Sequence, residues 1–337
     1  MQYIKHILIL FVSTAIMQAQ EKSTKIFSQK GAIEAKIAFS TKQLKKSYED
    51  TVYFDTPLRY KFDGQWNEMT IGIRARGNFR RSTCYYPPVK VDLKKGERKN
   101  TIFSGQKKMK LVLPCLQQKD KNDNILKELM VYKLYELVTP YHFKTRRLRL
   151  TFKDLSKRNP EEEVLNAFFI EDDKKVAKRH EAKVMERFVH PLAMQPDVAV
   201  RNALFQYMIG NTDFSVAYQH NGKLLYVNNK ALPLPYDFDM SGFINPSYAV
   251  VNETLNIRNI RERKFRGFKR KEDVFYAARD HFISQKSAMF SLMRSFENDF
   301  QNPKEYQEAY TYLEGFFEII EDDAAFRKNI IDAARTK

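Results

Sequence analysis

Two short stretches decide the fold, Thr70-Ile71-Gly72-Ile73-Arg74 and Val89-Lys90-Val91-Asp92-Leu93, because each alternates apolar with polar or small side chains. Such alternation is typical of a β-strand that buries one face. Residues 35–39 and 109–113 show the same pattern, and turn-forming pairs that contain glycine separate the stretches. Because short turns join antiparallel strands, we predict an antiparallel sheet across residues 31–115.

Helical patterns follow this predicted sheet. Asn124 can cap a helix whose apolar side chains recur at helical spacing until Pro140 ends it. Two more strands are predicted at residues 147–152 and 166–170, and long helical patterns fill the chain after about residue 271.

Strands followed by helices are typical of an α+β protein, here one of two lobes. We expect a β-rich N-lobe with one helix at residues 31–172. A helical C-lobe is expected at residues 173–337, with a strand pair at 223–227 and 232–236. The cleft between two such lobes is the expected binding site.

The first residues are typical of a secretory signal. Lys5 and His6 precede an apolar run, and Gln18-Ala19-Gln20 offers a cleavage point. We expect a signal peptide at residues 1–19, an exposed linker at 20–30, and export to the periplasm or beyond the cell. The alternative is an uncleaved amphipathic helix. No later apolar run reaches the roughly 20 residues that span a bilayer, so no transmembrane span is expected.

Cys84 and Cys115 are the only two cysteines of the chain. Cysteines of exported proteins usually pair, and two alone are too few for a metal site. We therefore predict a disulfide that joins neighbouring strands.

The chain is strongly basic, with 58 Lys and Arg against 41 Asp and Glu and a net charge of +17. Such an excess favours anionic partners, among them nucleotides and charged envelope polymers. Export removes genomic nucleic acid from the expected partners. The basic segment at residues 261–271, which also contains two phenylalanines, is interpreted as a substrate-docking loop or as a plain surface loop.

A dense polar cluster lies between residues 210 and 242. Asp237 and Asp239 are two residues apart, so on an extended segment both carboxylates point to the same side. Asn221 adds an amide oxygen, and Asp213 can hold an attacking hydroxyl. Mg²⁺ prefers oxygen ligands of this kind, which indicates metal-assisted chemistry on a phosphate. The alternative is that the two aspartates only cap a loop and bind backbone amides.

These motifs resemble those of the spore coat protein H (CotH) family of atypical kinases and, more distantly, HipA-type kinases. The matching pieces are Gly210-Asn211-Thr212-Asp213, then Asn221, then Tyr236-Asp237-Phe238-Asp239. Arg74-Ala75-Arg76-Gly77-Asn78 and the segment from Ala167 to Glu171, followed by Arg179, match the N-terminal half. The resemblance implies a two-lobed protein-kinase-like fold with an antiparallel β-rich N-lobe and a mainly helical C-lobe.

The resemblance also implies roles for individual residues. Asp213 would orient or deprotonate the acceptor hydroxyl. Asn221 and Asp237 would hold Mg²⁺ against the phosphates of ATP or another nucleotide, with Asp239 as a further metal contact. The spacing of eight residues between Asp213 and Asn221 requires a longer loop than kinases commonly use.

The implied nucleotide-binding residues lie in the N-terminal half. Lys110, or else Lys90, would contact the phosphates and pair with Glu128 on the first helix. Arg76 would cover the phosphates, and Glu171 would lie at the junction of the lobes. The implied activity is phosphoryl transfer to a protein or a cell-envelope acceptor.

Two other functions remain open from the residues alone. One is a non-catalytic protein that binds an anionic envelope polymer in its basic cleft. The other is a metal-dependent phosphodiesterase or nuclease that uses the same carboxylates. The motifs of serine hydrolases, zinc proteases and P-loop enzymes are absent from the sequence.

Overall fold

The computed structural model describes residues 25–46, 51–77, 79–118, 120–251 and 253–336. The predicted signal peptide at 1–19 lies outside these residues. Part of the predicted exposed linker is described, and there Lys25–Ser28 forms the short helix α1. The Ile26 side chain of α1 is buried, and its backbone N–H donates to Ile102.

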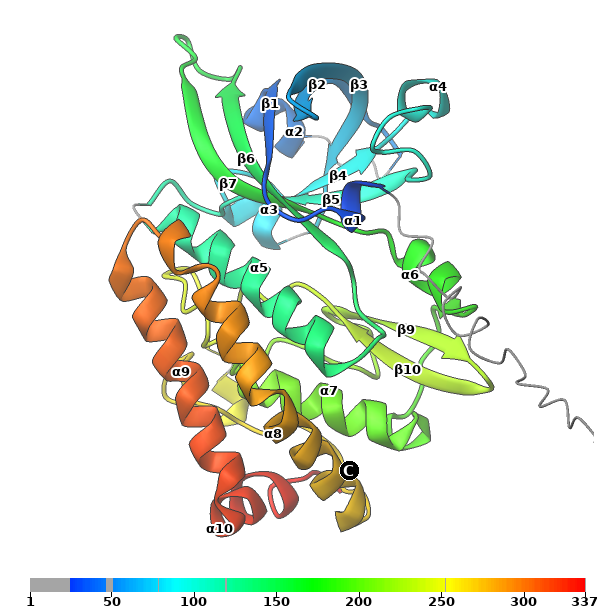
Figure 1. The fold of residues 1–337 in the computed structure, drawn as a ribbon, viewed down its shortest axis with the longest axis vertical. Helices are drawn as coiled ribbons and strands as arrows, with labels where there is room; N and C mark the ends of the chain where they lie inside the picture. The colour runs from blue at the N-terminus through cyan, green and yellow to red at the C-terminus, as the bar shows by residue number, and fades with distance from the viewer. Residues whose placement is uncertain (1–24, 47–50, 78, 119, 252, 337) are drawn as a thin grey trace, which may run out of the picture.

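Seven strands form a closed barrel at one end of the molecule (Figure 1). They are β1 (Ile33–Phe39), β2 (Phe54–Phe62), β3 (Gln65–Ala75), β4 (Val89–Asp92), β5 (Lys108–Val112), β6 (Thr145–Asp154) and β7 (Glu162–Ile170). Neighbours around the ring follow the order β1-β2-β3-β4-β5-β7-β6, and β1 closes the ring against β6. Short helices α2 (Thr41–Lys46), α3 (Phe79–Thr83) and α4 (Lys95–Arg98) lie in the connections.

The expectation of a two-lobed protein-kinase-like fold with an antiparallel β-rich N-lobe is wrong. The sheet is closed and mixed, because β1 pairs in parallel with β6 from Ile33 opposite Leu148 to Phe39 opposite Asp154. Closure satisfies the backbone donors and acceptors that two edge strands would leave open. Alternation along residues 35–39 predicts a strand, but it does not say that a strand far along the chain will pair with it.

The alternation seen in the sequence decides which side chains fill the barrel. Ile71 and Ile73 of β3 and Val89 and Val91 of β4 are buried inside, where they pack with apolar side chains from the other strands. The residues between them, such as Lys90, face outward because successive side chains point to opposite faces of a strand. The strands therefore present one row of polar side chains to the rest of the molecule.

Helices form most of the other half of the molecule. The long ones are α5 (Lys121–Val138), α7 (Pro196–Met208), α8 (Glu272–Arg294) and α9 (Pro303–Glu321), and the short ones are α6 (Asp173–Arg179) and α10 (Asp323–Phe326). A small antiparallel sheet in the order β10-β9-β8 accompanies them, formed by β8 (Lys183–Met185), β9 (Gly222–Val227) and β10 (Lys230–Pro235). Single turns of 3₁₀ or π helix occur at Pro191–Ala193, Glu253–Leu255, Glu297–Asp299 and Arg327–Ile331.

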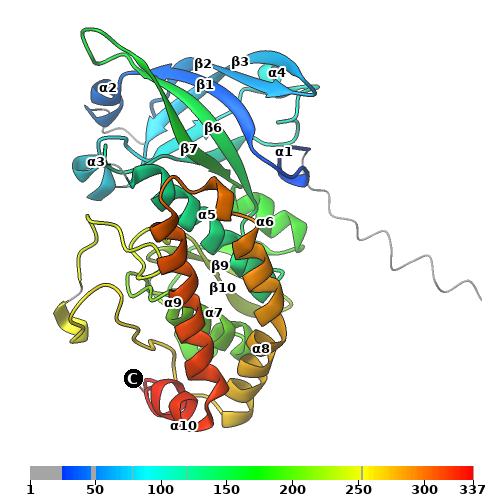
Figure 2. The same cartoon turned by 60° about the vertical axis from the view of Figure 1, so that its left-hand side comes forward.

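Helix α5 joins the barrel to the helical half, and it lies between them in both views (Figures 1 and 2). Nearly all of its side chains are buried, so it contacts neighbours on every side. Its apolar residues share one core with Phe168 and Ile170 of β7 and with side chains of α7, α8 and α9. Helix α5 thus holds the barrel at a set position over the helices, and the surfaces that face each other across this junction build the site.

The predicted disulfide between Cys84 and Cys115 is present. It joins the residue that follows α3 to the segment that follows β5, whereas we expected it to join two strands. Among the described residues, no helix is both long enough and apolar enough to cross a membrane.

Candidate functional site

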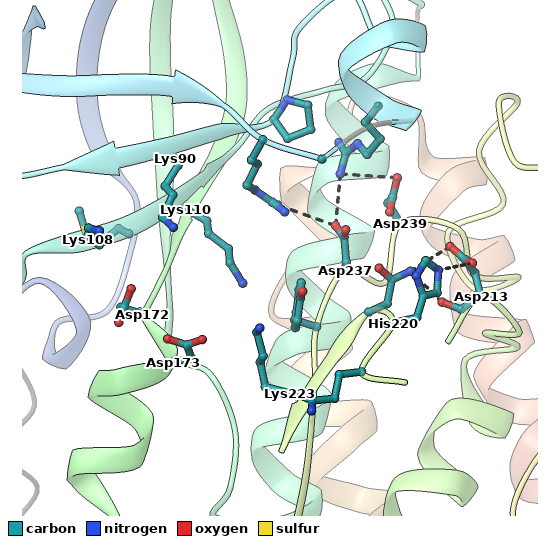
Figure 3. Close-up of a pocket in the computed structure, with 18 of the residues that line it drawn as sticks. Lys90, Lys108, Lys110, Asp172, Asp173, Asp213, His220, Lys223, Asp237 and Asp239 are labelled. Carbon is teal, nitrogen blue, oxygen red and sulfur yellow. Dashed lines mark hydrogen bonds and ion pairs between the residues drawn. The ribbon is translucent and has the colours of Figure 1, made fainter. Parts of the chain in front are cut away.

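A cleft of about 1290 Å³ lies between the barrel and the helical half, bounded by strands β3 to β5 on one side and by residues 212–240 on the other (Figure 3). Eleven Lys or Arg side chains and six Asp or Glu side chains line it. The cleft is large enough for a nucleotide, because small-molecule pockets usually measure about 300–1,000 Å³. Its excess of positive charge favours an anionic ligand.

One wall of the cleft carries a row of cations. Arg74 on β3 is paired in register with Lys90 on β4, and Lys90 is paired with Lys110 on β5. Neighbouring strands are only about 4.8 Å apart, so three positive side chains stand side by side. Burial, together with Arg74 and Lys108, lowers the pKa of Lys90. Like charges that face each other across strands are unfavourable, and an anion bound against the row relieves this repulsion.

Lys110 lies at the centre of the cleft. Burial lowers its pKa to about 7, and the nearby Arg76 acts in the same direction. Its ammonium is 3.7 Å from the ring centroid of Tyr236 and 5.0 Å from that of Phe143. In the described part of the chain it forms no ion pair with Glu128, its expected partner. Lys110 is therefore available to an anionic ligand.

Asp237 and Asp239 meet two arginines at the other end of the cleft. Arg80 Nη1 lies 3.5 Å from Asp237 Oδ1 and 3.6 Å from Asp239 Oδ2, and Arg76 Nη2 lies 3.8 Å from Asp237 Oδ1. Burial by itself raises the pKa of Asp237, but Arg76, Arg80 and Lys110 outweigh it and hold that pKa below its usual value. Burial dominates at Asp239, where the pKa is raised. Asp237 is therefore the more strongly ionised of the two.

The backbone at Asp237 adopts a left-handed conformation with φ of 63°. Non-glycine residues rarely adopt it, and such strain clusters at functional sites. The Asp237 N–H donates to Tyr132 Oη of α5 at 2.9 Å, which helps to hold this conformation. The segment therefore turns at Asp237, whereas we expected it to be extended.

Asp213, His220 and Asn221 form a hydrogen-bonded group beside these carboxylates. Asn221 Nδ2 donates to the carbonyl oxygen of Asp213 at 2.7 Å and to Asp213 Oδ2 at 2.9 Å. His220 Nε2 lies 2.9 Å from Asp213 Oδ1. Ser215 and His220 exchange backbone hydrogen bonds, and this tight loop brings Asp213 and Asn221 together across their long spacing. The Asp213 side chain remains 45% exposed and so accessible from the solvent.

Close backbone packing joins the two motif segments. The Gly242 N–H donates to Gly210, and the Phe243 N–H donates to Ile209. A Cβ at Gly210 would lie 2.0 Å from Tyr312 Oη, so only glycine fits there, with a φ of 62°. Arg266 donates to the carbonyl oxygens of Thr212 and Phe214, which fixes the loop that carries Asp213.

The two predicted glutamates have different surroundings. Glu128 is buried, and the pKa of its carboxyl is raised to about 8 by burial and by Asp239. Glu171 is bound on both carboxylate oxygens by Arg179 at 2.7 and 2.6 Å, and Glu171 does not line the cleft. Of the nine predicted site residues, seven line the cleft, whereas Glu128 is buried outside its lining and Glu171 supports the end of β7. Arg80 was missed; it lies in the basic run from Arg74 to Arg81, close to Cys84.

Asp237, Asp239 and Asn221 carry oxygen atoms of the kind that Mg²⁺ prefers. No group of three or more His, Cys, Asp or Glu side chains in the described residues is arranged for a metal. Asp237 and Asp239 nevertheless converge on one nitrogen of Arg80. Asn221 Nδ2 donates a hydrogen bond to Asp213, so Asn221 Oδ1 can accept from or coordinate a ligand. Mg²⁺ commonly takes one or two carboxylates together with substrate phosphates and water, and this set is of that kind.

A search against protein-family models finds no match to this chain, and none of the curated proteins searched matches it. The functional argument accordingly rests on the geometry of the cleft.

Proposed function

We propose that this protein transfers a phosphoryl group, with Mg²⁺, from a nucleoside triphosphate to a hydroxyl group of a protein or cell-envelope acceptor. The observation that carries the proposal is the placement of the Asp213–Asn221 pair and Asp237 opposite the row of cations on the barrel. Phosphoryl transfer depends mainly on positioning and on charge neutralisation, and the cleft supplies groups for both.

Cations of the barrel would bind the donor phosphates. Arg76 lies 3.8 Å from Asp237, and the positive charge of Lys110 helps to lower the pKa of Asp237. Lys90 and Arg74 continue the row along the adjacent strands. These cations hold the donor chain against the wall of the cleft and neutralise the charge that the transfer develops.

Asp237, with Asp239 and Asn221 Oδ1, would hold Mg²⁺. When bound, this ion would neutralise charge on the donor phosphates. Asp237 suits this role because the nearby arginines keep it ionised. The left-handed turn at Asp237 keeps the carboxylate directed toward Arg76 and Arg80.

Asp213 would orient the acceptor. The hydroxyl oxygen of the acceptor forms a bond to the terminal phosphorus while its proton passes to Asp213, and the bond between that phosphorus and the leaving diphosphate breaks. The bonds from Asn221 and His220 hold the carboxylate in place for this step. Because Asp213 is exposed, the acceptor can be a large molecule.

The proposal rests on the site and not on the fold. The closed barrel differs from the fold that the CotH resemblance implies, yet one chemistry recurs on unrelated scaffolds. We infer that the resemblance reflects a shared arrangement of site residues. The disulfide is compatible with export, which we also propose.

A thermal melt tests the nucleotide and metal site. ATP alone, MgCl₂ alone and the two together are compared on the protein and on Asp237→Asn, with Glu163→Gln as a matched variant that removes a paired carboxylate outside the cleft. A ligand at about 100 times its Kd adds roughly 2.7 kcal/mol, which raises Tm by a few degrees. We expect the largest shift with both ligands, its loss in Asp237→Asn and its retention in Glu163→Gln. Equal shifts with and without Mg²⁺ would contradict the proposal.

One observation favours a second candidate, a protein that binds an anionic polymer without catalysis. Arg80 already bridges Asp237 and Asp239, so these carboxylates are neutralised without a metal. For that function, chelation of Mg²⁺ and the variant Asp213→Asn should leave polymer binding unchanged, and no labelled phosphate should be transferred.

A further inference from the structure

The end of the cleft away from Asp213 is lined almost entirely by charged side chains. Lys90 and Lys108 lie there beside Asp172 and Asp173 (Figure 3). The same end continues onto helix α6, where Lys175 is half-buried. Further lysines on this part of the lining are Lys107, Lys174 and Lys178.

Three of these lysines are half-buried, and none of the three forms an ion pair with another described residue. They are Lys90, Lys108 and Lys175. Burial, followed by nearby cations, lowers the pKa of Lys90 and of Lys175. Crowding lysines in this way is unfavourable because their charges repel, and bound anionic groups would offset this repulsion.

The carboxylates at this end do not cancel the excess of lysines. Asp172 accepts from the Lys174 N–H at 3.1 Å and so caps α6. Asp173 follows it in the first turn of the helix. Two aspartates thus face six lysines, and the end remains cationic.

We propose that this end of the cleft is a second anion subsite, formed by Lys90, Lys108 and Lys175, which binds the outer phosphates of a linear oligophosphate whose inner end lies at Lys110 and Arg76. The direction in which the oligophosphate lies rests on the proposed function, but its binding at the subsite does not require that function. A ligand that reaches both subsites is longer than the triphosphate of a nucleotide.

The spacing of the cations favours this class of ligand. Lys90 stands opposite Lys110, about 4.8 Å away across the strands, and Lys108 lies two residues from Lys110, about 6.8 Å along β5. A linear oligophosphate carries charge on every link and can meet each cation in turn. A nucleobase is an uncharged aromatic ring that binds by stacking and hydrogen bonds, so it would not neutralise the lysines at this end.

The test measures binding by titration calorimetry, without Mg²⁺ and at constant ionic strength. The probes are sodium tripolyphosphate, a linear polyphosphate of about 15 phosphates, and an oligogalacturonate of similar charge. The proteins are the wild type, the double variant Lys108→Gln/Lys175→Gln, and Lys153→Gln. Lys153 is a half-buried strand lysine of the same barrel that does not line the cleft.

We expect the longer polyphosphate to bind the wild type at least about tenfold more tightly than tripolyphosphate. A gain of this size corresponds to roughly one additional charged contact. This gain should disappear in the double variant and persist in Lys153→Gln. Equal affinity for the two chain lengths would overturn the inference. So would a gain that survives in the double variant, or an equal or tighter affinity for the oligogalacturonate.

Failure of this inference can be told apart from failure of the proposed function. Asp237→Asn should abolish the stabilisation by ATP with Mg²⁺, yet leave the Mg²⁺-free advantage of the longer polyphosphate intact. The double variant should remove that advantage and leave the Mg²⁺ dependence of ATP binding in place.

Discussion

Asn221 binds Asp213 twice through one nitrogen, at the carbonyl oxygen and at the carboxylate. Both partners are acceptors, so the orientation of the amide is determined: Nδ2 must face Asp213 and Oδ1 must face away. One side chain therefore links the group proposed to orient the acceptor to the group proposed to hold the metal.

Replacing Asn221 separates these two roles. Asn221→Asp removes the donor and places a second negative charge beside Asp213, so we expect phosphate transfer to fall by about 100-fold or more. Initial rates with saturating ATP measure the effect. Asn67→Asp, at an exposed position on β3, should leave the rate unchanged. A rate within twofold of the wild type in Asn221→Asp would contradict the role of this contact.

Lys110 should make phosphate binding depend on pH. Its pKa of about 7 means that the free protein carries this charge below pH 7 and loses it above. An anion favours the charged form, so affinity for tripolyphosphate should be greatest below pH 7 and weaken as the pH rises through 7 and beyond. Calorimetric titrations between pH 6 and 9 would show the slope. Lys110→Arg keeps its charge across this pH range, so the affinity of this variant for tripolyphosphate should change little with pH. An affinity that still falls with rising pH in Lys110→Arg would point to another group.

The disulfide should stabilise both the fold and the site. Cys84 and Cys115 are 31 residues apart, and closing a loop of that length contributes about 3 to 4 kcal/mol. Arg80 lies on the segment that the bridge anchors, and its Nη2 also donates to the Leu113 carbonyl oxygen at 3.3 Å. We expect Cys84→Ser/Cys115→Ser to unfold at a lower concentration of denaturant than the wild type and to bind ATP with Mg²⁺ more weakly. An unchanged ATP affinity in the folded double variant would show that Arg80 keeps its place without the bridge.

Gly210 should not tolerate a side chain. In Gly210→Ala the new Cβ would meet Tyr312 Oη, and the positive φ adds strain, so the free energy of unfolding should fall by about 2 kcal/mol or more. Tyr312→Phe removes the obstructing oxygen at the cost of its bond to the Arg261 carbonyl oxygen. Adding Tyr312→Phe to Gly210→Ala should therefore recover part of the loss in urea unfolding. If the double variant is as unstable as the sum of the single variants, the clash is not the cause.

The sequence predicted much of the site because local patterns determine it. Alternation along β3, β4 and β5 sets which residues face the cleft, and this places Arg76, Lys90 and Lys110 together. The polar cluster from Asp213 to Asp239 is also close in sequence. Arg80 was missed because its position depends on a short helix held by a disulfide, and neither produces a periodic pattern.

The closed barrel could not be predicted in the same way. Strand β1 is identified by its own alternation, but its parallel pairing with β6 involves residues far apart in the chain. Pairing of this kind depends on the packing of the whole molecule. Glu128 and Lys110, which lie on consecutive elements and were expected to pair, form no ion pair with each other in the described structure.

Transfer of the terminal phosphate of ATP tests the central claim most directly. The protein is incubated with ATP labelled at the γ-phosphate and Mg²⁺, with a cell-envelope extract as acceptor and with chelator in a parallel sample. The comparison includes Asp213→Asn, Asp237→Asn and the control Glu163→Gln. We predict labelled acceptor for the wild type and Glu163→Gln, and none with chelator or with either aspartate variant. Label in Asp213→Asn and Asp237→Asn at the level of the wild type would contradict the account. So would the absence of label from every sample although ATP binds.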